Sequence, residues 1–222
     1  MKTLKIIEKL GLVACLMTLG PIYAGGEENM KSSASLEQQL REMPAPYERH
    51  LTLFVAALKR DSLKRLREAV TLWLGPDVSL ATKARAVLNE VGSPALDPLL
   101  EAPLPITADD KLWMVRVLTE ETEALRARIA AKLDPLLSDQ AKIPTPPMKG
   151  PGTEEGTPPS RLCDEVFLHA RRLITPTESS EDYYNFMYKF LRLPEAQKNK
   201  EITQWRHSAA WLRLVHAGKQ VP

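Results

Sequence analysis

One pentapeptide, Leu-Asp-Pro-Leu-Leu, occurs twice in this chain, at residues 96–100 and 133–137. The two copies are 37 residues apart, which is about the length of a helical hairpin. Each copy closes a segment whose apolar residues recur with the period of an α-helix. A repeat at this interval is typical of helical hairpins stacked along one axis. The alternative is an ordinary helical bundle in which the two strings coincide by chance, since leucine is a common residue.

Helical periodicity is found along most of the chain, whereas no long stretch alternates β-branched or aromatic residues with polar ones. The sequence therefore predicts an all-α protein. The leucines of both copies are expected to face inward, and the outer face of the helix before the second copy is expected to carry Arg126, Arg128 and Lys132. Helices are predicted at residues 36–42, 47–59, 178–193 and 200–216, and six more follow the predicted N-caps Asp61 or Ser62, Ser79, Ser93, Thr107, Thr122 and Ser160.

The turn Val91-Gly92-Ser93-Pro94 and the helix start that follows it resemble the junction between the two helices of a HEAT repeat. The resemblance is best from Ala81 to Asp139, and residues 46–138 form the predicted repeat domain if residues 47–74 are an earlier hairpin. It implies antiparallel helical hairpins with HEAT-like stacking. It also implies a role in binding other proteins or as a scaffold.

The second copy departs from the HEAT pattern. Ile129 stands where Gly92 does, and Ala131 stands where Pro94 does. Neither residue ends a helix as glycine and proline do, so the turn of this hairpin must fall earlier, near residues 120–122.

The N-terminus has the pattern of an export signal. Lysines precede the uncharged, mostly apolar run of residues 10–19, and Ala24 supplies a small residue at the cleavage position. The run is shorter than the ~20 residues that cross a bilayer. We therefore expect residues 1–24 to be a signal peptide that is cleaved between Ala24 and Gly25. The mature protein would be periplasmic or secreted, with a flexible lead-in at residues 25–45.

A lipid anchor is the alternative to ordinary secretion. The string that ends at Cys15, Leu-Val-Ala-Cys, resembles the lipobox of bacterial lipoproteins. Acylation of Cys15 would leave only residues 10–14 as the apolar core, which is shorter than the ~7 residues normally found. Ordinary secretion is therefore favoured, and the alternative protein would be a lipid-anchored envelope assembly protein.

Residues 139–159 are predicted to be a linker because they are dense in proline and glycine and have no apolar period. Residues 160–222 follow as a three-helix unit, either a separate domain or a cap on the repeat stack. Its only cysteine, Cys163, lies among apolar residues and is expected to be buried. The helix at 178–193 is expected to be covered on several sides. The unit's largest aromatic residues would pack in the core or line a groove: Tyr183, Tyr184, Tyr188, Trp205 and Trp211.

The formal net charge of +2 gives no reason to expect binding to nucleic acid. Basic residues do gather at the junction of the first two long helices, where they could bind an acidic partner or simply form a solvated turn. We expect the partner to be another protein or a peptide. The basic group consists of Lys59, Arg60, Lys64, Arg65 and Arg67.

Catalysis is not expected. The four histidines lack the spacing of metal ligands, and motifs for a nucleophile or for a nucleotide cofactor are absent from the sequence. Glu165 and His169 are four residues apart and share a helix face, so they are the one candidate acid/base pair. The alternative function is therefore an envelope hydrolase that uses this pair. The simpler interpretation of the two residues is a local ion pair or hydrogen bond.

Overall fold

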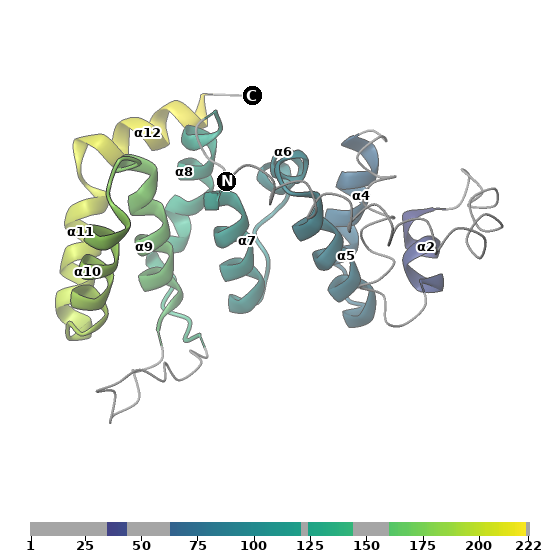
Figure 1. Ribbon diagram of the computed structural model, residues 1–222, viewed down its shortest axis with the longest axis horizontal. Helices are drawn as coiled ribbons and strands as arrows, with labels where there is room; N and C mark the ends of the chain where they lie inside the picture. The colour runs from purple at the N-terminus through teal and green to yellow at the C-terminus, as the bar shows by residue number, and fades with distance from the viewer. Residues whose placement is uncertain (1–34, 44–62, 121–123, 144–159, 221–222) are drawn as a thin grey trace, which may run out of the picture. The chain divides into compact units, whose positions relative to one another are not determined.

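A computed structural model describes residues 35–43, 63–120, 124–143 and 160–220 (Figure 1). These residues form helices and no strand, which confirms the all-α prediction. The chain divides into two compact units, residues 1–43 and 44–222, and each is considered by itself.

In the first unit, helix α2 spans Leu36–Glu42, as predicted. The Ser35 side chain accepts a hydrogen bond from the backbone N–H of Gln38 and caps the helix. Leu36 and Leu40, one turn apart, are buried. The helix ends at Met43, which precedes a proline and has an extended backbone.

In the second unit, α4 (Leu63–Trp73) and α5 (Val78–Val91) pack side by side. The predicted cap of α5 is wrong by two residues, because Asp77 rather than Ser79 accepts the hydrogen bond from the Leu80 N–H, at 3.1 Å. Gly92 ends α5 with a φ of 71°, a backbone conformation that favours glycine. The predicted helix at 47–59 lies outside the described residues.

The two pentapeptide copies adopt different structures. The first follows a 3₁₀ turn, η1 (Ser93–Ala95), and opens helix α6 (Leu96–Glu101). The second closes helix α8 (Arg126–Leu133) and continues as a 3₁₀ helix, η2 (Asp134–Ser138). Between them lies α7 (Ala108–Glu120), for which Thr107 accepts the capping bond as predicted; the predicted cap Thr122 lies outside the described residues. Five of the six leucines are buried and Leu100 is half-buried.

The C-terminal part has four helices where the sequence predicted three. The predicted helix at 200–216 is broken at His207 and Ser208, and the Ser208 side chain caps the new helix by accepting from the Trp211 N–H. The four helices are α9 (Leu162–Ile174), α10 (Ser180–Leu191), α11 (Glu195–Arg206) and α12 (Ala209–Lys219).

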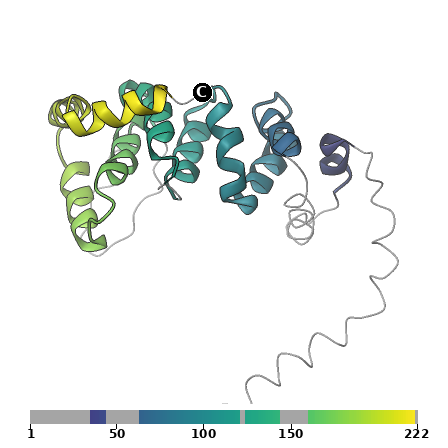
Figure 2. The same ribbon diagram turned by 90° about the horizontal axis from the view of Figure 1, so that it is seen from above.

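The C-terminal helices pack directly onto the helices of the predicted repeat domain. Helix α9 packs on α7, and α12 lies against α8 (Figure 2). Gly218 is the next-to-last residue of α12, and a Cβ at this position would lie 1.9 Å from the carbonyl oxygen of Ala127 in α8. Gly218 therefore permits the close approach of the two helices.

The start of the predicted linker is paired with the residues that follow the linker. Lys142 and Arg161 form an antiparallel bridge, and the Ile143 N–H donates to the carbonyl of Ser160 at 2.8 Å. Ile143 is also buried. Residues 139–143, the start of the predicted linker, are therefore held against the residues around the start of α9. Residues 144–159 lie outside the described residues.

Helix α10 is less covered than predicted. Only Phe190 and Leu191 are buried on it, whereas Tyr184 and Tyr188 are about half exposed. The expectation that neighbours enclose this helix on several sides is therefore wrong. Trp211 is instead fully buried, and the half-buried Trp205 packs on it with the two rings 4.4 Å apart.

Candidate functional site

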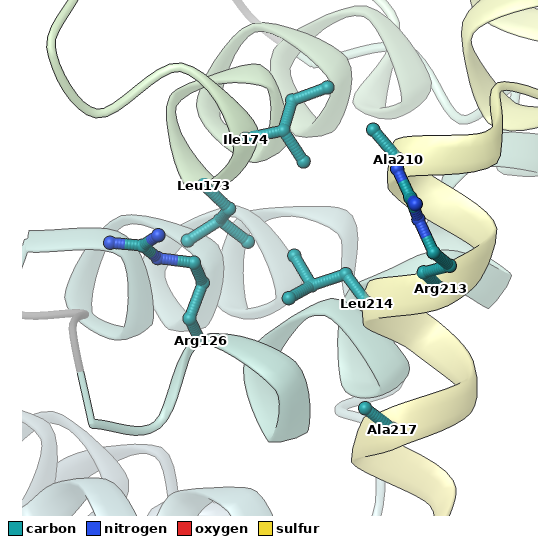
Figure 3. A pocket seen from close by; sticks show the side chains of 7 residues that line it. All are labelled: Arg126, Leu173, Ile174, Ala210, Arg213, Leu214 and Ala217. Carbon is teal, nitrogen blue, oxygen red and sulfur yellow. The ribbon is translucent and has the colours of Figure 1, made fainter.

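A hollow of about 320 Å³ lies where α8, α9 and α12 meet (Figure 3). We call it the α8–α9–α12 hollow. Its walls come from three segments that are far apart in the sequence. The residues that line it are Arg126, Leu173, Ile174, Ala210, Arg213, Leu214 and Ala217.

The hollow has an apolar surface because of how α12 is built. Ala210, Leu214 and Ala217 follow one another at helical spacing, so they lie on one face of the helix. The two alanines are small and leave open space on either side of Leu214. The end of α9 adds Leu173, which is buried, and Ile174, which is half-buried. The surface therefore suits an apolar side chain.

Two arginines flank this apolar surface from opposite sides, Arg126 on α8 and Arg213 on α12. The Arg213 Nε donates to the backbone carbonyl of Ala209 at 3.1 Å. The Arg126 Nε is buried and has no hydrogen-bond partner in the described part of the chain. A buried donor without a partner costs about 1–3 kcal/mol, and an acceptor on a ligand would remove that cost. The hollow can therefore bind a group that is apolar at its centre and carries oxygen acceptors at its edge.

The structure gives His169 a packing role. Its Nδ1 lies 3.1 Å from Thr119 Oγ1 on α7, and the Thr119 hydroxyl donates to the carbonyl of Val115. Burial, together with repulsion from Arg116 and Arg172, lowers the pKa of His169 to about 4. His169 is therefore neutral at neutral pH and joins α9 to α7. Neither Glu165 nor His169 lines either of the two hollows described in this structure, which removes the geometric support for an acid/base pair.

The predicted basic group is only partly described, since Lys59 and Arg60 lie outside the described residues. Lys64 is exposed on α4. Arg67 is held by two hydrogen bonds to the carboxylate of Glu101, at 2.9 and 3.2 Å. Arg65 is half-buried and also interacts with other groups. This part of the group is therefore not a set of freely available cations.

The predicted export residues Cys15, Ala24 and Gly25 lie outside the described residues, so their assignments remain predictions. Cys163 is fully buried, as expected from its apolar neighbours. Burial raises the pKa of its thiol to about 11, with a smaller contribution from Asp164. The thiol is therefore protonated at neutral pH and is a poor nucleophile.

Three cationic residues that were predicted to lie on an outer face of α8 face other parts of the chain instead. Arg126 lines the hollow, Arg128 donates to the carboxylate of Asp97, and Lys132 donates to the carbonyls of Leu100 and Ala102. Periodicity within α8 could not reveal these roles, because the neighbouring surfaces come from other helices. Arg213 was missed for the same reason.

Within the described ranges, no group of three or more histidine, cysteine or acidic side chains is arranged to hold a metal ion. Over the same residues, no helix has both the length and the apolar character needed to cross a bilayer. Comparison of the chain with family models, with curated proteins and with solved structures finds no match.

Proposed function

We propose that this protein is an exported, non-catalytic adaptor or scaffold of the cell envelope that binds another protein or a peptide. The observation that carries the proposal is the α8–α9–α12 hollow, in which an apolar surface lies between two arginines and one buried Nε has no hydrogen-bond partner among the described residues. A segment with an apolar side chain next to an acidic one would complement it, because a guanidinium pairs well with a carboxylate. Buried aromatic or aliphatic anchors carry much of the energy of such interfaces.

The proposal includes HEAT-like stacking of the hairpins. In support, the aspartate of each pentapeptide copy accepts hydrogen bonds from an arginine of a later helix. Arg128 of α8 donates to Asp97, and Arg206 of α11 donates to Asp134. The two aspartates thus make the same kind of contact, an ion pair with an arginine of a later helix, although Arg128 is 31 and Arg206 is 72 residues away.

The binding proposal can be tested by affinity capture from envelope extract with matched variants. The test variant combines Arg126→Gln with Arg213→Gln, and the control combines Arg192→Gln with Lys200→Gln, two exposed residues outside the hollow. Both double variants lose two positive charges. We expect a protein captured by the wild type and by the control to be lost with the test variant. Equal capture by both double variants, or no specific capture by the wild type, would contradict the proposal.

The export proposal has a separate test. The protein is expressed from its own start codon and purified from the envelope, and its N-terminus is determined by mass spectrometry. A chain that begins at Gly25 supports cleavage by signal peptidase. A chain that keeps Met1 contradicts export by this route, and an acylated N-terminal Cys15 would identify the lipoprotein alternative.

A further inference from the structure

A second hollow of about 210 Å³ lies between η2 and α11 and shares no lining residue with the first. We call it the η2–α11 hollow. Most of its lining residues carry hydrogen-bonding groups, while two are apolar. The residues are Leu137, Ser138, Gln140, Asn199, Ile202, Thr203, Arg206 and His207.

A buried arginine fixes the orientation of two amides at this hollow. Arg161 is only 4% exposed, and its NH1 donates to Gln140 Oε1 at 2.7 Å and to Asn199 Oδ1 at 2.8 Å. A guanidinium can only donate, so the carbonyl oxygen of each amide must face Arg161. The NH2 group of each amide must then point away from Arg161. Gln140 and Asn199 are both exposed, so these NH2 groups are available to a ligand.

The same hollow has a further oriented donor. The NH1 of Arg206 donates to Ser138 Oγ at 2.6 Å, while its Nε and NH2 are held by Asp134. Because the Ser138 oxygen accepts this bond, the hydroxyl proton is free to be donated to another acceptor. Three donors, two amide NH2 groups and one hydroxyl, are therefore held on residues that line one hollow.

The positive charge that lies behind the amides of Gln140 and Asn199 also favours the binding of an anion. Arg161 and Lys198 are both buried, and both pair with the single carboxylate of Asp164, at 2.6 and 3.7 Å. Two cations thus share one anion in this buried cluster, and the nearby Glu195 is exposed to solvent. A negatively charged acceptor at the amides would be attracted by the remaining positive charge.

We propose that the η2–α11 hollow binds the C-terminal residue of a peptide, with the free carboxylate on the NH2 groups of Gln140 and Asn199. A carboxylate has two acceptor oxygens, which matches two oriented donors. Leu137 and Ile202 are buried beside these donors and offer an apolar contact. A C-terminal apolar residue carries its side chain and its carboxylate on the same Cα, whereas an acidic side chain has no apolar group of its own to place there.

The first test compares ligands on the wild-type protein by ¹⁵N–¹H NMR of the side-chain amides. N-acetyl-Gly-Gly-Leu with a free carboxylate is expected to shift the NH2 signals of Gln140 and Asn199. Its carboxamide is expected to bind at least about tenfold more weakly, which corresponds to ~1.4 kcal/mol. N-acetyl-Asp-N-methylamide tests an acidic side chain as the source of the carboxylate. Equal binding of acid and carboxamide, equal binding of the aspartate probe, or no shift with any probe would overturn the proposal.

The second test uses isosteric variants. Gln140→Glu and Asn199→Asp keep an oxygen for Arg161 but replace the donor NH2 with a second oxygen and add a negative charge. Each is expected to weaken binding of the free-carboxylate peptide at least about tenfold and to remove its own NH2 signal from the spectrum. Gln197→Glu, an exposed position on the same helix, makes the same chemical change away from the hollow and is expected to bind like the wild type. If Gln197→Glu weakens peptide binding equally, the added negative charge alone explains the loss of affinity, and the proposal is overturned.

These tests do not depend on the adaptor proposal. The peptides are small, and the signals observed belong to the η2–α11 hollow alone. The Arg126 and Arg213 variants of the adaptor test lie outside it. Failure of either proposal is therefore visible without the other. If an isosteric variant does not fold, as judged by circular dichroism, the comparison of acid and carboxamide on the wild type still decides the question.

Discussion

The two copies of Leu-Asp-Pro-Leu-Leu have the same residues but different surroundings. In the first copy, the Asp97 side chain is 50% exposed and its partner Arg128 is 31 residues away in sequence. In the second copy, the Asp134 side chain is 18% exposed. It accepts two hydrogen bonds from Arg206 and one from the indole N–H of Trp211, which are 72 and 77 residues away. The second copy is thus covered by the C-terminal helices, and the first is not covered in this way.

The comparison shows that tertiary context decides what this pentapeptide becomes. Pro98 stands in the first turn of α6, where the backbone N–H that proline lacks has no helical partner in any case. Pro135 follows eight helical residues, and there the missing N–H interrupts the hydrogen-bond ladder. The α-helix therefore ends at Leu133, and the chain continues as a 3₁₀ helix. The same proline opens one helix and closes another.

The largest expected effect tests what the copies have in common. Leu99 and Leu136 occupy the same position of the pentapeptide and are 0% and 3% exposed. Replacing either with alanine removes a buried side chain and leaves a cavity, so Leu99→Ala and Leu136→Ala should each lower the free energy of unfolding by ~2–5 kcal/mol. Urea unfolding followed by circular dichroism measures both. Leu63→Ala, at an exposed position, is the control and should change little. A loss near zero for one of the core variants would mean that its copy is not part of the core.

The second largest effect, that of Gly218→Ala, should be felt by the second pentapeptide copy and not by the first. Gly218→Ala would place a methyl group against the backbone of Ala127, so α12 must move away from α8. We expect a loss of ~1–3 kcal/mol. Hydrogen exchange should become faster around residues 133–138 and stay unchanged around residues 96–100. The control is Ala217→Ser, an exposed neighbour on the same helix. Equal acceleration at both copies would show that α12 does not specifically support the second.

A smaller difference is expected between the two aspartates. Asp134→Ala leaves the donors of Arg206 and Trp211 without their acceptor in a partly buried site, which should cost ~1–3 kcal/mol. Asp97→Ala removes a more exposed pair and should cost ~0–1 kcal/mol. Thermal and urea unfolding of the two variants can be compared directly. If the two variants lose similar amounts of stability, the different burial of the two aspartates does not determine how much each one contributes.

The smallest effect is a dependence on pH. Burial alone would raise the pKa of Asp134, but the hydrogen bonds from Arg206 and Trp211 outweigh it and lower the pKa below its ordinary value of about 4. A lowered pKa means that the ionised form stabilises the fold above the pKa of the unfolded chain. This stabilisation is lost as the pH falls through the pKa of the folded state. The stability difference between the wild type and Asp134→Asn should therefore shrink on acidification below pH ~4. A stability difference that stays constant with pH would contradict a lowered pKa of Asp134.

The helices could largely be predicted from the sequence because their signals are local. The apolar periods and the cap at Thr107 are set by residues within a few positions of each other. The break before Ser208 was missed because Trp205 and Leu212 continue the apolar pattern across it. The role of Gly218 could not be predicted either, because only the backbone of the neighbouring α8 requires a residue without a side chain at this position.

The candidate sites could not be predicted in this way. Arg126 and Arg213 meet at one hollow only because α12 crosses α8, and no local pattern encodes that crossing. Likewise, the amides of Gln140 and Asn199 are oriented by Arg161, which belongs to a third segment. Sequence spacing finds groups on one helix face. It drew attention to Glu165 and His169, which line neither hollow.

The bridge between Lys142 and Arg161 has a practical consequence. Because the backbone is paired at this point, the length of the chain between the two residues is decoupled from the positions of the helices. Closing a longer loop costs only about 0.6 kcal/mol for each doubling of its length. An epitope tag or a fluorescent reporter inserted there should leave the stability of the helices nearly unchanged, which gives a handle for following the protein in living cells.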